Sequence, residues 1–299
     1  LRGVHYLELL AMLGAIQGVL LLLLISFRYR HRRNLPLALF ILALSLRLGT
    51  IPSWSQATLL AHPWLLSLTG SLPFLFGPLM WWAVRELETG RLEPARISPL
   101  HFLPYAAETL LVGVLVAAMT VAQYHAFVES IFAGSPPWWM PARNMLKLAS
   151  GAIYTALAAR VAFTPVSAHC GRMARMRRLW LQTLVVAPVG ALVAFGVIAV
   201  RPDASAMLAA GDVTVFLILA AAMVAIVYTI SFLVITAPEV LVRQPAHAPA
   251  PPAVEAHAHP VVEPEECADL MDRLEQLLED GAFKNPELTL RDVARQLDV

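Results

Sequence analysis

Residues 213–236 read VTVFLILAAAMVAIVYTISFLVIT, a run of 24 residues without a charged side chain. The hydrocarbon core of a bilayer is about 30 Å thick, and an α-helix rises about 1.5 Å per residue. Roughly 20 apolar residues therefore suffice to cross it. We predict that residues 213–236 form a membrane-spanning helix.

Six further stretches have similar length and composition, which predicts an all-α fold built on a seven-helix transmembrane bundle. They cover residues 4–27, 35–51, 64–84, 100–124, 144–163 and 179–200. The composition agrees, because 58% of the 299 residues are hydrophobic and only 14% are charged. Soluble domains are about a quarter charged, so the chain is expected to have the lipid bilayer as a partner.

The arginines near the span ends are unevenly divided between the two sides of the predicted bundle. Basic residues concentrate in cytoplasmic loops, and tryptophans favour the membrane–water interfaces. One side holds only Arg2, Arg143 and Arg201, together with several tryptophans. The other side holds eleven arginines: Arg28, Arg30, Arg32, Arg33, Arg85, Arg91, Arg96, Arg172, Arg175, Arg177 and Arg178. The amino end is therefore expected outside the cell and the carboxyl end in the cytoplasm.

Composition changes sharply after Thr236 and divides the chain into three parts. Residues 1–236 form the predicted seven-span domain, and residues 237–264 form a Pro/Ala-rich linker with seven prolines. Dense proline disfavours helix and gives an extended, semi-rigid segment. Residues 265–299 return to helical periodicity, and Thr289 with Asp292 gives a capping box for a second short helix.

Residues 269–299 read DLMDRLEQLLEDGAFKNPELTLRDVARQLDV, and this stretch resembles the start of the DNA-binding domain of AraC-type transcription regulators. Residues 286–299 match the first helix of its helix-turn-helix. Residues 14–49 and 72–90 are similar to the seven-helix domains that precede such regulators in bacteria. The resemblance implies a membrane-tethered transcription regulator of the bacterial inner membrane that senses an unknown small-molecule or membrane signal.

The same resemblance implies that DNA is bound through the complete carboxyl-terminal domain, and it allows a homodimer. The sequence reaches Val299 before the second helix, which would enter the major groove. Residues 265–299 contain ten acidic and four basic residues, and their net charge of −6 disfavours contacts with DNA phosphates. Residues 265–299 alone are thus not expected to bind DNA. Their candidate DNA-side residues are Thr289, Arg291 and Arg295, although a solvated helix surface suits both arginines.

Four charged residues lie inside predicted spans, where each needs a partner or an aqueous surface. Glu8 and Arg47 lie near the outer ends of adjacent predicted spans, and Glu108 and Arg160 are expected near the inner ends of the fourth and fifth spans. We expect two interhelical ion pairs, Glu8 with Arg47 and Glu108 with Arg160. Snorkelling of the side chain to the interface is the alternative for Arg160, and a ligand-binding role is a further alternative for all four.

Gly14 and Gly18 form a GxxxG pair in the first span, which permits close approach of another helix. That helix belongs either to the same bundle or to a second copy of the chain.

Catalytic chemistry is not expected. The sequence has no Gly-rich phosphate loop, HExxH or CxxC motif, and we predict no catalytic residue, metal site or cofactor. Two other functions stay open: a membrane sensor with another output, such as a histidine kinase, and a transporter.

Overall fold

The structure is a computed structural model that describes residues 2–89, 97–164, 172–201, 207, 214–241, 273 and 277. Every regular element within these ranges is helical. Contacts divide the chain into one unit of Leu1–Thr164 with Met176–Gln244 and a second of Pro165–Arg175 with Pro245–Val299. The first unit contains all the helices discussed below, apart from the first turn of one of them.

Seven helical segments are long and apolar enough to cross a bilayer, which confirms the expected number of spans and indicates a multi-pass membrane protein. The segments are His5–Arg28, Arg32–Ser53, Trp64–Glu88, Pro99–Ala118, Trp139–Phe163, Arg175–Val200 and Thr214–Thr236. Many large apolar side chains on them are exposed, among them Leu110, Val193 and Ile235. A bilayer would cover this apolar surface.

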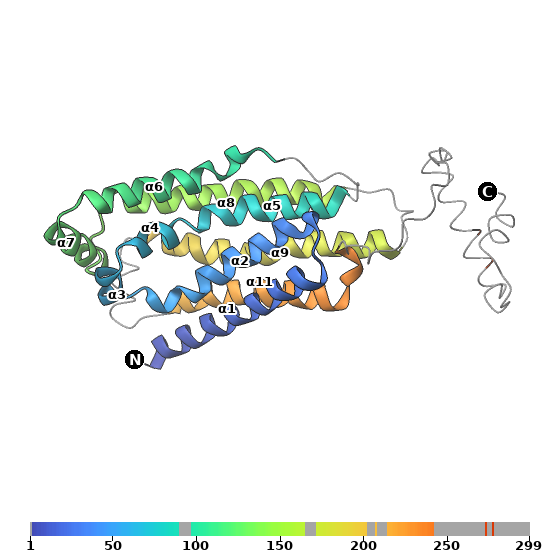
Figure 1. Cartoon of the computed structure of the whole chain (residues 1–299), viewed down its shortest axis with the longest axis horizontal. Coiled ribbons are helices and arrows are strands. Elements are labelled where there is room, and N and C mark those ends of the chain that lie inside the picture. The colour runs from blue at the N-terminus through green and yellow to red at the C-terminus, as the bar shows by residue number, and fades with distance from the viewer. Residues whose placement is uncertain are drawn as a thin grey trace. The chain divides into compact units, whose positions relative to one another are not determined.

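The long helices lie side by side as a bundle (Figure 1). The long ones are α1 (Arg2–Arg28), α2 (Leu35–Gly49), α5 (Pro73–Thr89), α6 (Leu103–Ala118), α8 (Trp139–Phe163), α9 (Arg172–Val200) and α11 (Thr214–Thr236). The short ones are α3 (Gln56–Ala61), α4 (Trp64–Gly70) and α7 (Val121–Phe132), with 3-10 turns η1 (Arg32–Asn34), η2 (Ile51–Ser53), η3 (Pro99–Phe102) and η4 (Pro238–Val240). Helix α1 packs on α2 and α11, α2 packs on α5, and α5 packs on α8.

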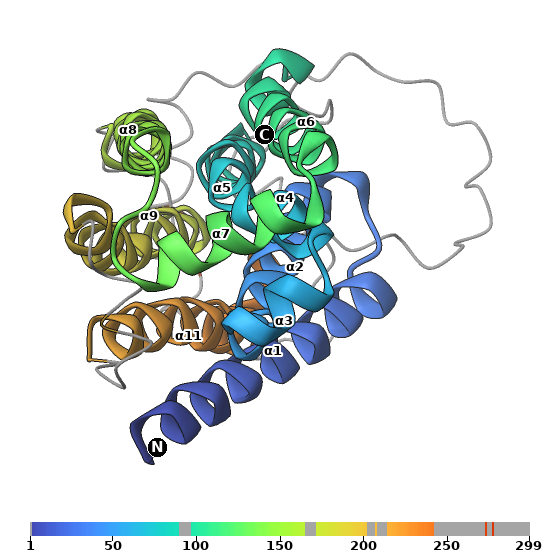
Figure 2. The same cartoon turned by 90° about the vertical axis from the view of Figure 1, so that its left-hand side faces the viewer.

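One end of the bundle is covered by α7, which crosses over the ends of the long helices (Figure 2). The Tyr124 hydroxyl of α7 donates a hydrogen bond to the Leu59 carbonyl of α3 at 2.8 Å, and Tyr124 is buried. The Phe127 ring stacks on Trp139 at the start of α8 with 5.8 Å between ring centroids. We call this the α7 end of the bundle.

The fourth span is shorter than predicted. Helix α6 stops at Ala118, Met119 is extended, and a new helix starts after Thr120. The Thr120 hydroxyl accepts from the Gln123 amide at 3.3 Å, and the Gln123 side chain accepts from the Thr120 amide at 2.9 Å. This reciprocal capping box separates α7 from the span, so the predicted stretch 100–124 joined two helices into one.

The folded bundle continues past Thr236. Ala237, Val240 and Leu241 are buried in the main hydrophobic core, so packing extends into the segment predicted as linker. The rest of the predicted linker, and the candidate residues Thr289, Arg291 and Arg295, lie outside the described residues.

The two glycines of α1 face other helices of the same chain. A Cβ atom on Gly14 would lie 2.5 Å from Val224 Cγ2 of α11 and 3.0 Å from Leu48 Cδ1 of α2. A Cβ atom on Gly18 would lie 2.0 Å from the Ser45 hydroxyl oxygen of α2. The close approach that GxxxG permits is therefore used here within one bundle.

Replacing Gly14 by leucine is expected to destabilise the bundle, because Val224 is β-branched and has little freedom to move aside. Overpacking of this kind costs about 1–3 kcal/mol. Gly190→Leu is the matched control, since nothing lies within 4 Å of a Cβ atom there. Thermal unfolding of the detergent-solubilised variants would measure the difference, and equal melting temperatures would contradict the packing described.

Candidate functional site: a buried cationic cluster

A carboxylate on α6 holds two cations of α8 inside the apolar bundle. Glu108 Oε1 lies 2.9 Å from Arg143 Nε and 2.9 Å from Lys147 Nζ. The three side chains are nearly inaccessible, with exposed fractions of 7% for Glu108, 10% for Arg143 and 2% for Lys147. Arg143 and Lys147 are four residues apart and thus neighbours on one helix face, so Glu108 also offsets their mutual repulsion.

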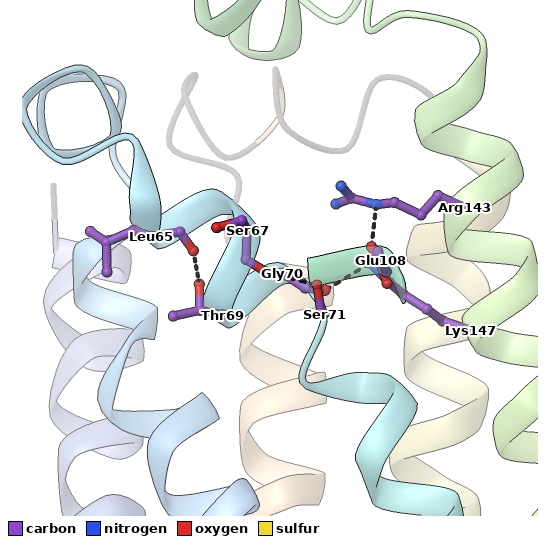
Figure 3. A network of polar contacts seen from close by, with 8 residues as sticks. All are labelled: Leu65, Ser67, Thr69, Gly70, Ser71, Glu108, Arg143 and Lys147. Atoms are coloured by element: carbon purple, nitrogen blue, oxygen red, sulfur yellow. Dashed lines mark hydrogen bonds and ion pairs between the residues drawn. The ribbon is translucent and has the colours of Figure 1, made fainter. Parts of the chain in front are cut away.

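Lys147 has a second partner at the break in the third span. Its ammonium group donates to the Gly70 carbonyl at 2.7 Å, at the carboxyl end of α4 (Figure 3). The last carbonyls of a helix lack partners within it and carry partial negative charge, so a cation is favoured there. Lys147 therefore ties α8 to the end of α4 as well as to α6.

The break itself is stabilised by local hydrogen bonds from small polar side chains. The Thr69 hydroxyl donates to the Leu65 carbonyl at 2.6 Å, and the Ser71 hydroxyl donates to the Ser67 carbonyl at 2.7 Å (Figure 3). Pro73 then starts α5, which suits proline because the first turn of a helix needs no amide donor. The break presents the Gly70 carbonyl to Lys147.

Arg47 of α2 brings a third cation to this region. Its guanidinium lies over the Trp54 ring, 5.2 Å from the ring centroid. Within the described part of the chain, Arg47 Nη1, Arg143 Nη1 and Glu108 Oε2 are buried and have no hydrogen-bond partner. We refer to Arg47, Arg143 and Lys147 as the cationic cluster; Glu108 balances only one of its three charges.

Two cavities adjoin the cationic cluster. The larger, of about 410 Å³, lies among residues of α1, α2, α7, α8 and α9 at the α7 end. The smaller, of about 100 Å³, lies among α2, α5, α8, α9 and α11 and is lined mainly by apolar side chains. Arg47 and Lys147 line both cavities, as do Pro73 and Phe195. The bundle thus has a polar space next to an apolar one.

The ion pairs expected from the sequence differ from those in the structure. Glu108 pairs with Arg143 and Lys147 instead of Arg160, which is exposed and lies about 20 Å further along α8 than Lys147. Glu8 lies 3.5 Å from the imidazole of His5. Among the described residues no ion pair joins Glu8 to Arg47, although both line the larger cavity.

Sequence reasoning missed the two partners of Glu108. The sequence predicts Arg143 in an outer loop, but α8 starts at Trp139 and carries Arg143 into the bundle. Lys147 lies inside the predicted span 144–163, and the sequence analysis gives it no role. A lysine within an apolar span needs a partner, and its spacing of four residues from Arg143 was the available signal.

A second polar cluster lies away from these cavities and joins η1 to α5. Arg33 Nε lies 3.6 Å from Glu86 Oε2, and the Arg33 guanidinium also donates to the Glu86 carbonyl at 3.0 Å. The Trp82 indole donates to the other carboxylate oxygen of Glu86 at 3.2 Å. Its one cation is balanced by one carboxylate, and none of these three residues lines either cavity, so this cluster is best explained as structural.

Comparison of the chain with protein-family models, curated proteins and solved structures finds no match. The class defined by the fold is that of a multi-pass membrane protein, and the site above must be interpreted from its own chemistry.

Replacing Glu108 by glutamine removes the one carboxylate that, among the described residues, forms an ion pair with Arg143 and Lys147. Breaking a buried ion pair costs about 3–5 kcal/mol. We expect a clearly lower melting temperature and yield of folded protein for Glu108→Gln. Glu129→Gln, an exposed carboxylate on α7, should leave both unchanged.

A triple variant, Glu108→Leu with Arg143→Met and Lys147→Met, separates charge from packing. Removing all three charges should recover much of the stability lost in Glu108→Gln, because Arg143 and Lys147 are then no longer buried cations without their carboxylate. A triple variant as unstable as the single one would argue against an electrostatic role for Glu108.

Proposed function

We propose that the protein is a signal-responsive regulator, in which the seven-helix domain binds a ligand and a cytoplasmic tail controls transcription. The observation that carries the sensing part is the position of α11. Leu219, Met223 and Ile226 of α11 line the apolar cavity beside the cationic cluster. The same helix ends at Thr236, directly before the segment that leads to the AraC-like stretch.

A ligand at the cationic cluster could therefore act on the helix that connects to the tail. Helix α11 is also held against α1, where the Gln17 amide donates to the Ser231 hydroxyl at 3.0 Å. A ligand that contacts Met223 would compete with the contacts that hold α11 in place and would shift this helix. The size of the shift depends on how much more tightly the ligand binds one position of α11 than the other.

The gene-control part rests on the tail sequence. Residues 286–299 have the pattern of the first helix of an AraC-type helix-turn-helix, and Arg291 and Arg295 would lie on its surface. In a homodimer, a shift of α11 passed through the stiff linker would change how two tails are paired on DNA. This mechanism requires the tail to lie in the cytoplasm of a bacterium, as the arginine distribution predicts.

The orientation is tested by reporter fusions. Green fluorescent protein fused after Leu241 should fluoresce, because it folds in the cytoplasm, and alkaline phosphatase fused there should be inactive. Fusions after Arg201, on the opposite side of α11, should give the reverse pattern and serve as controls. Active phosphatase after Leu241 would overturn both the orientation and the role in transcription.

The transcriptional output is tested with the protein expressed from its own gene. Chromatin immunoprecipitation should enrich a small set of promoters, and the transcripts of the same genes should change when the gene is deleted. A chain stopped after Leu241 keeps the bundle and should lose both effects. Enrichment of no promoter, together with a phosphorylated partner protein, would favour a sensor of the kinase type instead.

A further inference from the structure

The larger cavity is surrounded by more positive than negative charge. Within the part of the chain that the structure describes, its charged lining residues are Arg47, Arg143, Lys147, Arg201 and Glu8. Glu108, paired with two of these cations, adds one further negative charge. Among the described residues, these four cations and two carboxylates leave a formal charge of +2 around this space.

Two of these cations have free donors in buried positions. The Arg143 side chain is nine-tenths buried, and Glu108 contacts its Nε while Nη1 has no hydrogen-bond partner among the described residues. Arg47 Nη1 is equally buried and unpartnered there. A buried donor without an acceptor is costly, and more so when it is charged. Guanidinium groups suit carboxylate or phosphate oxygens, which accept two parallel hydrogen bonds.

The smaller, apolar cavity adjoins the cationic cluster, because Arg47 and Lys147 line it together with apolar side chains. Beyond the residues shared by both cavities, its lining includes Phe76, Leu192 and Met223. An apolar chain would fill this space favourably, and a charged group would not. A ligand that satisfies both cavities has an anionic head and an apolar tail.

We propose that this site binds an amphiphilic anion, with a carboxylate or phosphate head between Arg47 and Arg143 and an apolar chain in the smaller cavity. As the signal of the regulator, this assignment rests on the function proposed above; as a binding site, it stands on the geometry alone. The head neutralises the excess positive charge, and Trp54 and Trp139 lie against the two guanidinium groups.

The test uses the purified chain in phosphatidylcholine nanodiscs, with octanoate and octyl phosphate as probes and calorimetry as the measurement. At least one anionic probe should bind at a single site, and neutral octan-1-ol should bind about tenfold more weakly or worse. Equal affinity for octan-1-ol and the anions would overturn the proposal, as would binding of neither anion.

Arg47→Gln is the decisive variant, because Arg47 has no ion pair among the described residues and its loss leaves no carboxylate alone. It should unfold at the wild-type temperature or higher and bind the anionic probe about tenfold more weakly. Arg160→Gln, exposed on α8 and about 25 Å along the helix from Arg143, should bind like the wild type. Unchanged affinity in a folded Arg47→Gln protein would refute the site.

Two further arms identify the source of the anion and keep the two proposals separate. Phosphatidylglycerol in the nanodisc should block the probe if a membrane lipid is the native ligand, and leave its affinity unchanged if the ligand is a free amphiphile. No step involves DNA, so failure to bind either probe would refute this site and leave a transcriptional role standing. Conversely, if the protein binds a probe but enriches no promoter, the binding site stands and the role in transcription is refuted.

Discussion

The arrangement of the bundle depends on one carboxylate shared by two cations in an apolar interior. Glu108 holds Arg143 and Lys147, and through Lys147 it also holds the carboxyl end of α4. A charge inside a bilayer-spanning bundle needs a partner or an aqueous surface, so this contact favours one depth of α6 relative to α8. At that depth α7 lies beyond the span, and Arg143, which lines the larger cavity, keeps a buried donor without a hydrogen-bond partner among the described residues.

The two polar clusters have different consequences because their charges are balanced to different degrees. Arg33 pairs one to one with Glu86, which also accepts a hydrogen bond from Trp82, and these contacts tie η1 to α5. The cationic cluster has more charge than its carboxylate can balance, and it adjoins a cavity. A protein under selection for stability alone would have little reason to retain such an excess, because apolar replacements of buried ions are often neutral or stabilising. This contrast supports a binding role for the cationic cluster.

The sequence predicted the number of spans well, because apolar length is a strong and local signal. The position of each span along the membrane normal was harder to predict. Residues 100–124 looked like one span, although the capping box of Thr120 and Gln123 ends it early, and that motif was visible in the sequence. The partners of Glu108 could not be deduced, since spacing along the chain does not determine how far α6 slides against α8. The cavities arise from packing among five or more segments and have no sequence signal.

The contact between α1 and α11 joins the first of the seven described spans to the seventh. Gln17 and Ser231 are 214 residues apart, and Gly14 lies close to Val224 of the same late helix. A ribosome must therefore make six spans before this surface of α1 has its partner, and until then the Gln17 amide has no Ser231 to bind. Among the described spans, the bundle is complete only when α11 is in place, so the helix that leads to the tail is also the one that closes the bundle.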